Sequence, residues 1–108
     1  LRDGRCHERI DIKPSVADGL LGTFTPLTFE ISRNLIDGVK LVEEDEIIHA
    51  MKVFQIEEQL MIEGSAAVGL AAILAGKINC KNQKVVLVLT GRNIDAGKYN
   101  NLVATKNR

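Results

Sequence analysis

The side chains best placed to do chemistry follow an apolar run near the end of the sequence. Thr90-Gly91-Arg92-Asn93 comes directly after the run KVVLVL at residues 84–89. A run without alternation is typical of a central strand in a parallel sheet. Ligands of open parallel sheets bind beyond the carboxyl ends of the strands, so these residues could form part of a binding site. From the pattern alone, a turn that ends the strand explains them equally well.

Glu63 is the second candidate, because it is the only acidic residue between Glu58 and Asp95. It precedes residues 65–75, which are nearly all small or aliphatic and predict a helix buried on every side. A carboxylate at the start of a helix is stabilised by the helix dipole. The simpler interpretation is an N-terminal cap, which the residues alone favour over a binding role.

Other common site patterns do not occur in the sequence. His7 and His49 are the only histidines, and they form neither a Ser-His-Asp set nor a paired metal-binding spacing. No two glycines are adjacent, which excludes a glycine-rich phosphate loop. Cys6 and Cys80 lie outside any C-x-x-C, so we expect no disulfide framework and no metal site. Such cysteine usage fits a reducing, cytoplasmic location.

Composition limits the classes of partner. The 14 basic residues balance the 14 acidic ones and are scattered, so we expect no nucleic-acid partner. The longest weakly polar run, residues 64–76, is shorter than the roughly 20 residues that span a bilayer, so we expect no membrane partner either. A chain of 108 residues with 45% hydrophobic residues suffices for one small globular domain or part of one.

Three helices must position these candidates. Thr25 and Pro26 favour a helix that starts at residue 26 and ends at Asp37-Gly38. The spacing of its apolar residues puts Leu27, Ile31 and Leu35 on one face. A second helix is expected at 43–59, where acidic residues crowd the start, and a third at 65–75 with a stop at Gly76. Gly64 and Gly69 would let another element pack very close to the third helix.

Strands are expected between the helices, at residues 9–13, 39–42 and 84–89. This order predicts an α/β architecture, a parallel sheet with crossover helices. One fully buried strand and one fully buried helix are more than a chain of this length can cover, so we expect the rest of the domain to be missing. Residues 98–108 are polar and predict a linker or a disordered tail.

Six short motifs between Ala17 and Asp95 resemble the late catalytic-domain sequence of threonine dehydratases and serine racemases. Each motif alone is weak, but all six occur in order and at family-like spacing. The last one looks like the strand and S-G-G-N turn of that family. The motifs are Ala17-Asp18-Gly19, Leu27-Thr28-Phe29 with Leu35-Ile36-Asp37, Val42-Glu43-Glu44-Asp45-Glu46-Ile47, Ile62-Glu63-Gly64-Ser65-Ala66-Ala67, Leu70-Ala71-Ala72, and the run 85–89 with Thr90-Gly91-Arg92-Asn93-Ile94-Asp95.

The resemblance implies a fold type II pyridoxal 5'-phosphate (PLP) enzyme with a tryptophan-synthase-β-like domain. It gives cofactor-binding roles to Thr90, Glu63, Gly19 and Gly91. The Thr90 hydroxyl would hydrogen-bond the pyridine nitrogen and leave it mostly unprotonated, which suits removal of a β-hydroxyl. Glu63 would lie beside the edge of the cofactor, and Gly19 would belong to a loop close to cofactor and substrate.

Arg92 departs from the family, which usually has glycine at this place. The G-R-N version resembles a dehydratase subgroup that includes hydroxyectoine-utilisation enzymes. An arginine here could reach a substrate carboxylate or point to solvent. Threonine in place of serine at residue 90 keeps the hydroxyl, so the implied role of Thr90 survives.

The family's Schiff-base lysine, in an S-x-K-x-R segment, and its glycine-rich phosphate loop do not occur in this sequence. We therefore expect no catalytic residue in this chain and no activity from it alone. Residues 1–97 are interpreted as the C-terminal segment of a PLP-dependent catalytic domain, and 98–108 as a polar tail. The implied partners are a small amino-acid substrate, the remainder of the catalytic domain, and further copies in a homo-oligomer.

The reaction implied for the complete enzyme is that of a threonine or serine ammonia-lyase, a dehydratase. It removes water from the hydroxy amino acid by β-elimination and yields an oxo acid and ammonia. An amino-acid racemase or another lyase of the same fold is the alternative within enzymes. A non-catalytic α/β interaction module that kept the scaffold is the alternative outside them.

Overall fold

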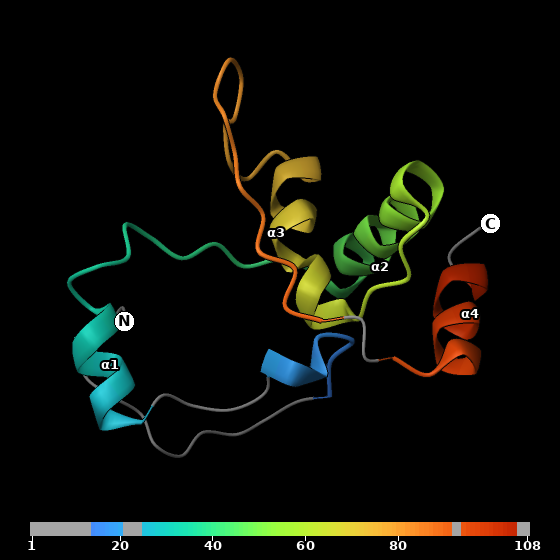
Figure 1. The fold of residues 1–108 in the computed structure, drawn as a ribbon, viewed down its shortest axis with the longest axis horizontal. Coiled ribbons are helices and arrows are strands. Elements are labelled where there is room, and N and C mark those ends of the chain that lie inside the picture. The colour runs from blue at the N-terminus through green and yellow to red at the C-terminus, as the bar shows by residue number, and fades with distance from the viewer. Residues whose placement is uncertain (1–13, 21–24, 92–93, 106–108) are drawn as a thin grey trace.

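The computed structural model describes residues 14–20, 25–91 and 94–105, and these form helices joined by extended or irregular chain (Figure 1). Within these residues no helix is long and apolar enough to cross a membrane. The elements in chain order are η1 (Asp18–Leu20), α1 (Pro26–Ser32), α2 (Glu44–Val53), η2 (Phe54–Glu58), α3 (Gly64–Leu74) and α4 (Ala96–Thr105).

Helix α2 and the π-helical turn η2 form one continuous element, which confirms the helix predicted at 43–59. Its start is held by a capping box, in which the Glu43 backbone N–H donates to the Glu46 carboxylate at 2.6 Å. Its apolar side chains Ile47, Met51 and Phe54 are buried in the core. The element ends at Gln59, whose φ of 56° turns the chain into the left-handed region.

Helix α3 confirms the helix predicted at 65–75 and the stop at Gly76. The ending is a Schellman motif, because the Gly76 N–H donates to the Ile73 carbonyl and the Lys77 N–H to the Ala72 carbonyl, both at 3.0 Å. Gly76 has a φ of 73°, a conformation that favours glycine. The expectation of burial on every side holds except at Leu74, which is exposed in this chain, while the other residues of α3 are buried or half-buried.

Helix α1 starts at Pro26 as predicted, and the Thr28 N–H donates to the Thr25 hydroxyl at 3.3 Å. It ends at Ser32, earlier than the predicted stop at Asp37-Gly38. The predicted apolar face is exposed, and Phe29 is the buried residue of this helix instead. Figure 1 shows the reason, because α1 stands apart from the group formed by α2, α3 and α4.

The predicted strands are absent from the described part of the chain, so the observed elements are helical where an α/β order was expected. Residues 39–42 and 84–89 are extended but belong to no ladder, and residues 9–13 lie outside the described residues. A strand needs a neighbouring chain to satisfy its backbone N–H and C=O groups. Val86 is 88% exposed and Val88 76%, which is unlike a strand covered on both faces.

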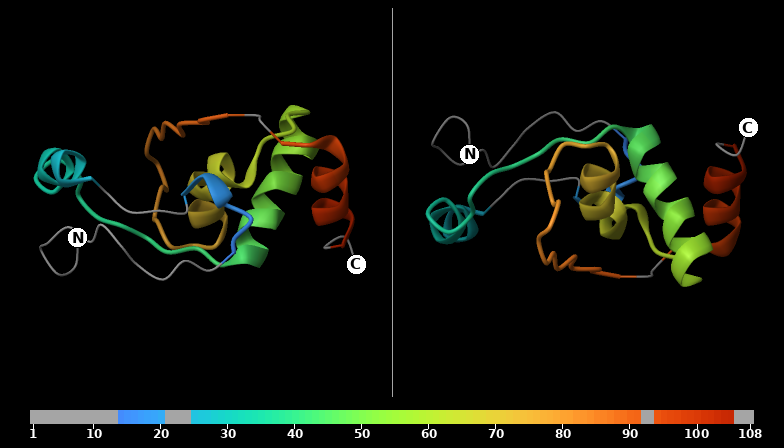
Figure 2. Two further views of the ribbon diagram at one scale, coloured as in Figure 1. Left: turned by 90° about the horizontal axis from the view of Figure 1, so that it is seen from below. Right: turned by 90° about the horizontal axis from the view of Figure 1, so that it is seen from above.

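Helix α4 corrects the expectation of a linker or disordered tail from residue 98. It packs against α2 (Figure 2), and Tyr99 is fully buried. The Tyr99 hydroxyl donates to the Met51 carbonyl at 3.1 Å and lies 3.3 Å from the Gln55 side-chain oxygen. A buried aromatic with a satisfied hydroxyl orders this segment despite its polar composition. The predicted end of the catalytic domain at residue 97 is not tested by this packing and stays a prediction.

Candidate functional site

Glu63 occupies the N-cap position of α3, with φ −75° and ψ 160°. Its backbone carbonyl accepts from the Ala66 N–H at 3.0 Å and so begins the helix. Its half-buried side chain makes no capping hydrogen bond. The cap interpretation is therefore right for the backbone and wrong for the carboxylate, which is not engaged with the N–H groups of the first helical turn.

The loop that precedes η1 is pressed against this end of α3. A Cβ atom on Gly64 would lie 2.3 Å from the Val16 carbonyl oxygen and 2.6 Å from its Cγ1, so only glycine fits here. This contact confirms that Gly64 allows very close packing. Gly19 lies in η1, which packs on α3. The fold thus brings the predicted site residues Gly19 and Glu63 to one end of α3.

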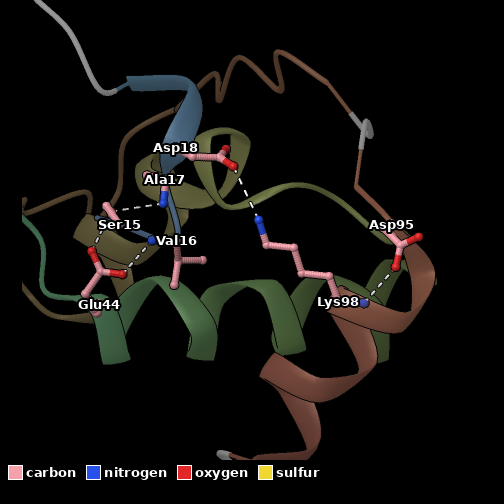
Figure 3. Close-up of polar contacts among 7 residues, drawn as sticks. All are labelled: Ser15, Val16, Ala17, Asp18, Glu44, Asp95 and Lys98. Atoms are coloured by element: carbon pink, nitrogen blue, oxygen red, sulfur yellow. Dashed lines mark hydrogen bonds and ion pairs between the residues drawn. The ribbon is translucent and has the colours of Figure 1, made fainter. Parts of the chain in front are cut away.

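Residues 15–19, which we name the 15–19 loop, are held from two other helices (Figure 3). The Ser15 hydroxyl donates to one oxygen of the Glu44 carboxylate at 2.5 Å, and the Val16 N–H donates to the other at 2.7 Å. On the opposite side, Lys98 of α4 forms an ion pair with Asp18 at 3.3 Å. Glu44 was not singled out from the sequence, because an acidic first turn is explained by the helix dipole alone.

The extended segment that carries Thr90 and Gly91 runs beside α3 (Figures 1 and 2). A Cβ atom on Gly69 would lie 3.0 Å from Leu87, which confirms the close approach predicted for this glycine. The segment runs opposite to α3, so its end lies toward the helix start, where the 15–19 loop packs. Thr90 is exposed and Gly91 is half-buried, while Arg92 lies outside the described residues.

Other parts of the described surface bring together no other set of candidate site residues. Among the described residues no group of three or more His, Cys, Asp and Glu side chains could hold a metal ion. A shallow hollow of about 210 Å³ lies between the start of α2 and the end of α3, lined by Asp45, His49 and Leu74 among others. None of the predicted site residues lines it. The candidate site is therefore the N-terminal end of α3, which carries a carboxylate, a backbone loop and a hydroxyl-bearing segment.

The chain is similar to solved structures of two enzymes. It superposes on serine racemase from Dictyostelium discoideum with a TM-score of 0.76 and 40% identity, over 87% of this chain and 30% of the other. It superposes on the T.th. threonine deaminase with a TM-score of 0.76 and 27% identity, over 87% of this chain and 34% of the other. The segment therefore has the fold of the corresponding part of these two enzymes.

Sequence comparison gives the same kinds of relative. The chain is 36% identical to the L-threonine ammonia-lyase of Thermotoga maritima over 95% of its own length and 25% of that protein. It is 39% identical to the serine racemase of Dictyostelium discoideum over 95% of its own length and 33% of that protein. The chain thus spans about a quarter to a third of the length of these relatives. The family described as "Pyridoxal-phosphate dependent enzyme" matches residues 2–91, and the chain belongs to this family.

Proposed function

We propose that the chain is the C-terminal segment of the catalytic domain of a PLP-dependent hydroxy-amino-acid ammonia-lyase. The observation that carries this proposal is the match to L-threonine ammonia-lyase, which takes in 95% of this chain but only 25% of that protein. The S-x-K-x-R segment and the glycine-rich loop expected of such an enzyme would then lie in the rest of the polypeptide. Residues 1–97 would belong to the catalytic domain, and 98–108 would follow it.

The residues at the start of α3 fit the edge of a flat, polar cofactor. The Glu63 carboxylate is not used to cap its own helix, so it is available for a ligand beside that helix. The exposed hydroxyl of Thr90 supplies a hydrogen-bonding group for a ring nitrogen. Gly19 and Gly91 add backbone without side chains, which allows a ligand to approach closely. Arg92, next in the chain, is the proposed partner for the carboxylate of the amino-acid substrate.

PLP, when bound, supplies the electron sink that makes elimination from an amino acid possible. The work of this chain is to bind and orient the ring and to set the proton at its nitrogen. A neutral hydroxyl at Thr90 would leave that nitrogen mostly unprotonated, whereas a carboxylate there would hold a proton on it. The milder sink that results suits loss of the β-hydroxyl of threonine or serine as water.

The extended segment 84–89 would become a strand in the complete domain. Its exposed valines, Val86 and Val88, and its backbone, which belongs to no ladder among the described residues, would be covered by chains on both sides. Neighbouring strands from the rest of the polypeptide would supply both, and the parallel sheet would then carry Thr90 at the carboxyl end of a strand. We propose that the complete enzyme assembles as a homo-oligomer. Its cytoplasmic location stays a prediction.

A racemase is the second candidate, favoured by the 39% identity to the serine racemase of Dictyostelium discoideum over 95% of the chain. Both reactions act on the same class of small hydroxy amino acid. The two candidates differ in product, because elimination yields an oxo acid and ammonia while racemisation yields the other enantiomer. A binding module without catalysis would yield neither.

The deciding experiment uses the complete enzyme that contains this segment, incubated with PLP and L-threonine or L-serine. Oxo acid as the main product supports the ammonia-lyase, and the D-amino acid as the main product supports the racemase. We expect the 108-residue chain alone to form no oxo acid under the same conditions. Turnover by that chain alone would overturn the assignment as a segment, and an inactive complete protein would favour the interaction module.

A further inference from the structure

The 15–19 loop is organised around a single carboxylate, that of Glu44 in the first turn of α2. Both of its oxygens are occupied, one by the Ser15 hydroxyl at 2.5 Å and the other by the Val16 N–H at 2.7 Å (Figure 3). The Ser15 hydroxyl oxygen accepts in turn from the Ala17 N–H at 3.0 Å. Two consecutive residues of the loop thereby donate to one side chain from a helix that lies 28 residues further along the chain, and the Ala17 N–H is tied to it indirectly, through Ser15.

Residue 16 is fixed on both of its faces. Its N–H points to Glu44, and its carbonyl oxygen packs against the bare Cα of Gly64 at the start of α3. A shift of the loop away from Glu44 would therefore also change its contact with α3. Gly64 follows Glu63 directly, so Glu44 and the start of α3 are linked through a single loop residue, Val16.

The second tie of the loop is weaker. Asp18 and Lys98 pair at 3.3 Å with both side chains more than half exposed. An exposed ion pair between two flexible side chains is screened by water and holds geometry poorly. Glu44 is also exposed, but its two bonds are charge-assisted, and one of them holds a backbone N–H, which has no side-chain freedom to lose. Glu44 is thus the stronger of these two polar ties of the loop.

We propose that Glu44 is a positioning residue for the cofactor site, which it serves by holding the 15–19 loop against the start of α3. This inference rests on the proposed function, since it assumes that Gly19 and Glu63 face PLP. Glu44 itself touches no reacting atom. Substitution of Glu44 should therefore weaken PLP binding by more than the accompanying loss of protein stability would explain.

The test compares variants of the complete enzyme by PLP affinity, by the absorbance spectrum of bound PLP, and by kcat and KM. Glu44→Leu removes both acceptor oxygens, and we expect PLP affinity to fall roughly tenfold or more. Glu44→Gln keeps one acceptor and should fall between Glu44→Leu and the wild type. Ser15→Ala added to Glu44→Leu should cost less than it does in the wild type, because the Ser15–Glu44 hydrogen bond is already lost in Glu44→Leu.

Two controls separate positioning from general destabilisation. Tyr99→Phe lowers stability by removing a buried hydrogen bond to α2, and the lost hydroxyl bonds no residue of the loop, so its PLP affinity should stay close to that of the wild type. Glu58→Gln removes one acidic charge at the exposed end of η2 and should change neither the stability nor the PLP affinity. Loss of PLP affinity in Tyr99→Phe as large as in Glu44→Leu would overturn the inference.

The outcomes for the function and for the positioning role are distinct. A wild-type enzyme that binds no PLP would refute the proposed function. A wild-type enzyme that binds PLP, beside a Glu44→Leu variant with affinity and kcat within about twofold of it, would refute the role of Glu44 alone. Partial recovery in Glu44→Gln, with faster amide exchange at Val16 and Ala17 in Glu44→Leu, is the expected result.

Discussion

The carbonyl oxygen of Val16 and the Cα of Gly64 are in such close contact that a Cβ atom at residue 64 would lie 2.3 Å from that oxygen. Backbone is on the other side of this contact, so it cannot turn away as a flexible side chain would. We expect Gly64→Ala to lower the free energy of unfolding by about 1–3 kcal/mol, as overpacking does elsewhere. Urea unfolding measures the difference.

Gly38→Ala is the matched control for that substitution, because nothing lies within 4 Å of the place where its Cβ would be. Its unfolding free energy should stay within about 0.5 kcal/mol of the wild type. Equal losses of unfolding free energy in Gly38→Ala and Gly64→Ala would mean that the added methyl group at residue 64 does not clash with Val16.

Thr90 is expected to act through its hydroxyl in the complete enzyme. Thr90→Ser keeps the group and should retain most PLP affinity and elimination activity. Thr90→Val is nearly isosteric and removes the hydroxyl, so PLP affinity should fall by the worth of one neutral hydrogen bond, about 0.5–1.5 kcal/mol. Thr90→Asp should hold a proton on the ring nitrogen and shift the ratio of elimination to α-proton exchange.

The Thr90 series is checked by titrating PLP into each variant and by measuring oxo acid together with solvent-deuterium exchange at the α-carbon. Thr90→Val with wild-type affinity and rate would show that Thr90 only ends the extended segment. The site assignment at this residue would then have to be given up.

The buried hydroxyl of Tyr99 makes α4 part of the core, since it donates to the Met51 carbonyl. Tyr99→Phe should lower the free energy of unfolding by about 0.5–1.5 kcal/mol near neutral pH. Burial also raises the pKa of Tyr99 above its ordinary value of 10.0. The folded state therefore keeps its proton at a pH where the unfolded state has lost it, and stability falls as pH rises above about 10 through the raised pKa.

Denaturation of wild type and Tyr99→Phe over a series of alkaline pH values tests both parts of this prediction. The stability advantage of the wild type should be constant below about pH 10 and should shrink above it. Parallel curves for the two proteins at high pH would contradict the assigned cause. A wild type no more stable than Tyr99→Phe at neutral pH would show that α4 is held by packing alone.

Glu46 links the start of α2 to the chain that follows α3. The Glu43 backbone N–H, and after it the ammonium group of Lys77 at 2.9 Å, hold the pKa of Glu46 below its ordinary value of 4.5. The stability that this carboxylate contributes is present above pH 4.5 and is lost as pH falls through the lowered pKa. Glu46→Gln should lack this acid-dependent part, as urea unfolding between about pH 6 and pH 3 would show.

Lys77→Met is the informative companion variant, because it removes the ion pair and leaves the capping box of Glu43 and Glu46 in place. Its acid-dependent loss should be smaller than that of the wild type but should not vanish, since the backbone N–H of Glu43 is the larger cause. Complete loss of the acid dependence in Lys77→Met would mean that the ion pair is the larger cause.

The segment 84–89 exposes a row of valines in this chain, with Val86 88% and Val88 76% exposed. Exposed apolar surface on an extended segment is a site of association between copies. We expect the 108-residue chain to bind a hydrophobic dye and to self-associate as its concentration rises. The double variant Val86→Thr/Val88→Thr should bind less dye and self-associate less, as dye fluorescence and light scattering would show. Unchanged dye binding and association would mean that another surface causes the association.

The sequence by itself determined the helices that carry their own start and stop signals. Thr25-Pro26 and the acidic turn at 43–46 begin helices where expected, and Gly76 ends one. These signals work because the hydrogen bonds of a helix join residues only four apart, so the residues that decide the helix are close together in the chain. The ordered motifs around Glu63 and Thr90 likewise sufficed to indicate the PLP family, since a family resemblance needs no contact map.

Only the tertiary structure decided the features that depend on distant partners. Tyr99 orders α4 through a carbonyl 48 residues away, and Glu44 holds a loop 28 residues before it, while both look like ordinary polar segments in the sequence. Residues 84–89 have the composition of a strand, yet they form none among the described residues because no neighbouring chain pairs with them. A strand takes its backbone hydrogen bonds from a neighbouring chain segment, whereas a helix makes them within its own residues. The sequence could therefore predict these helices but not the pairing of a strand.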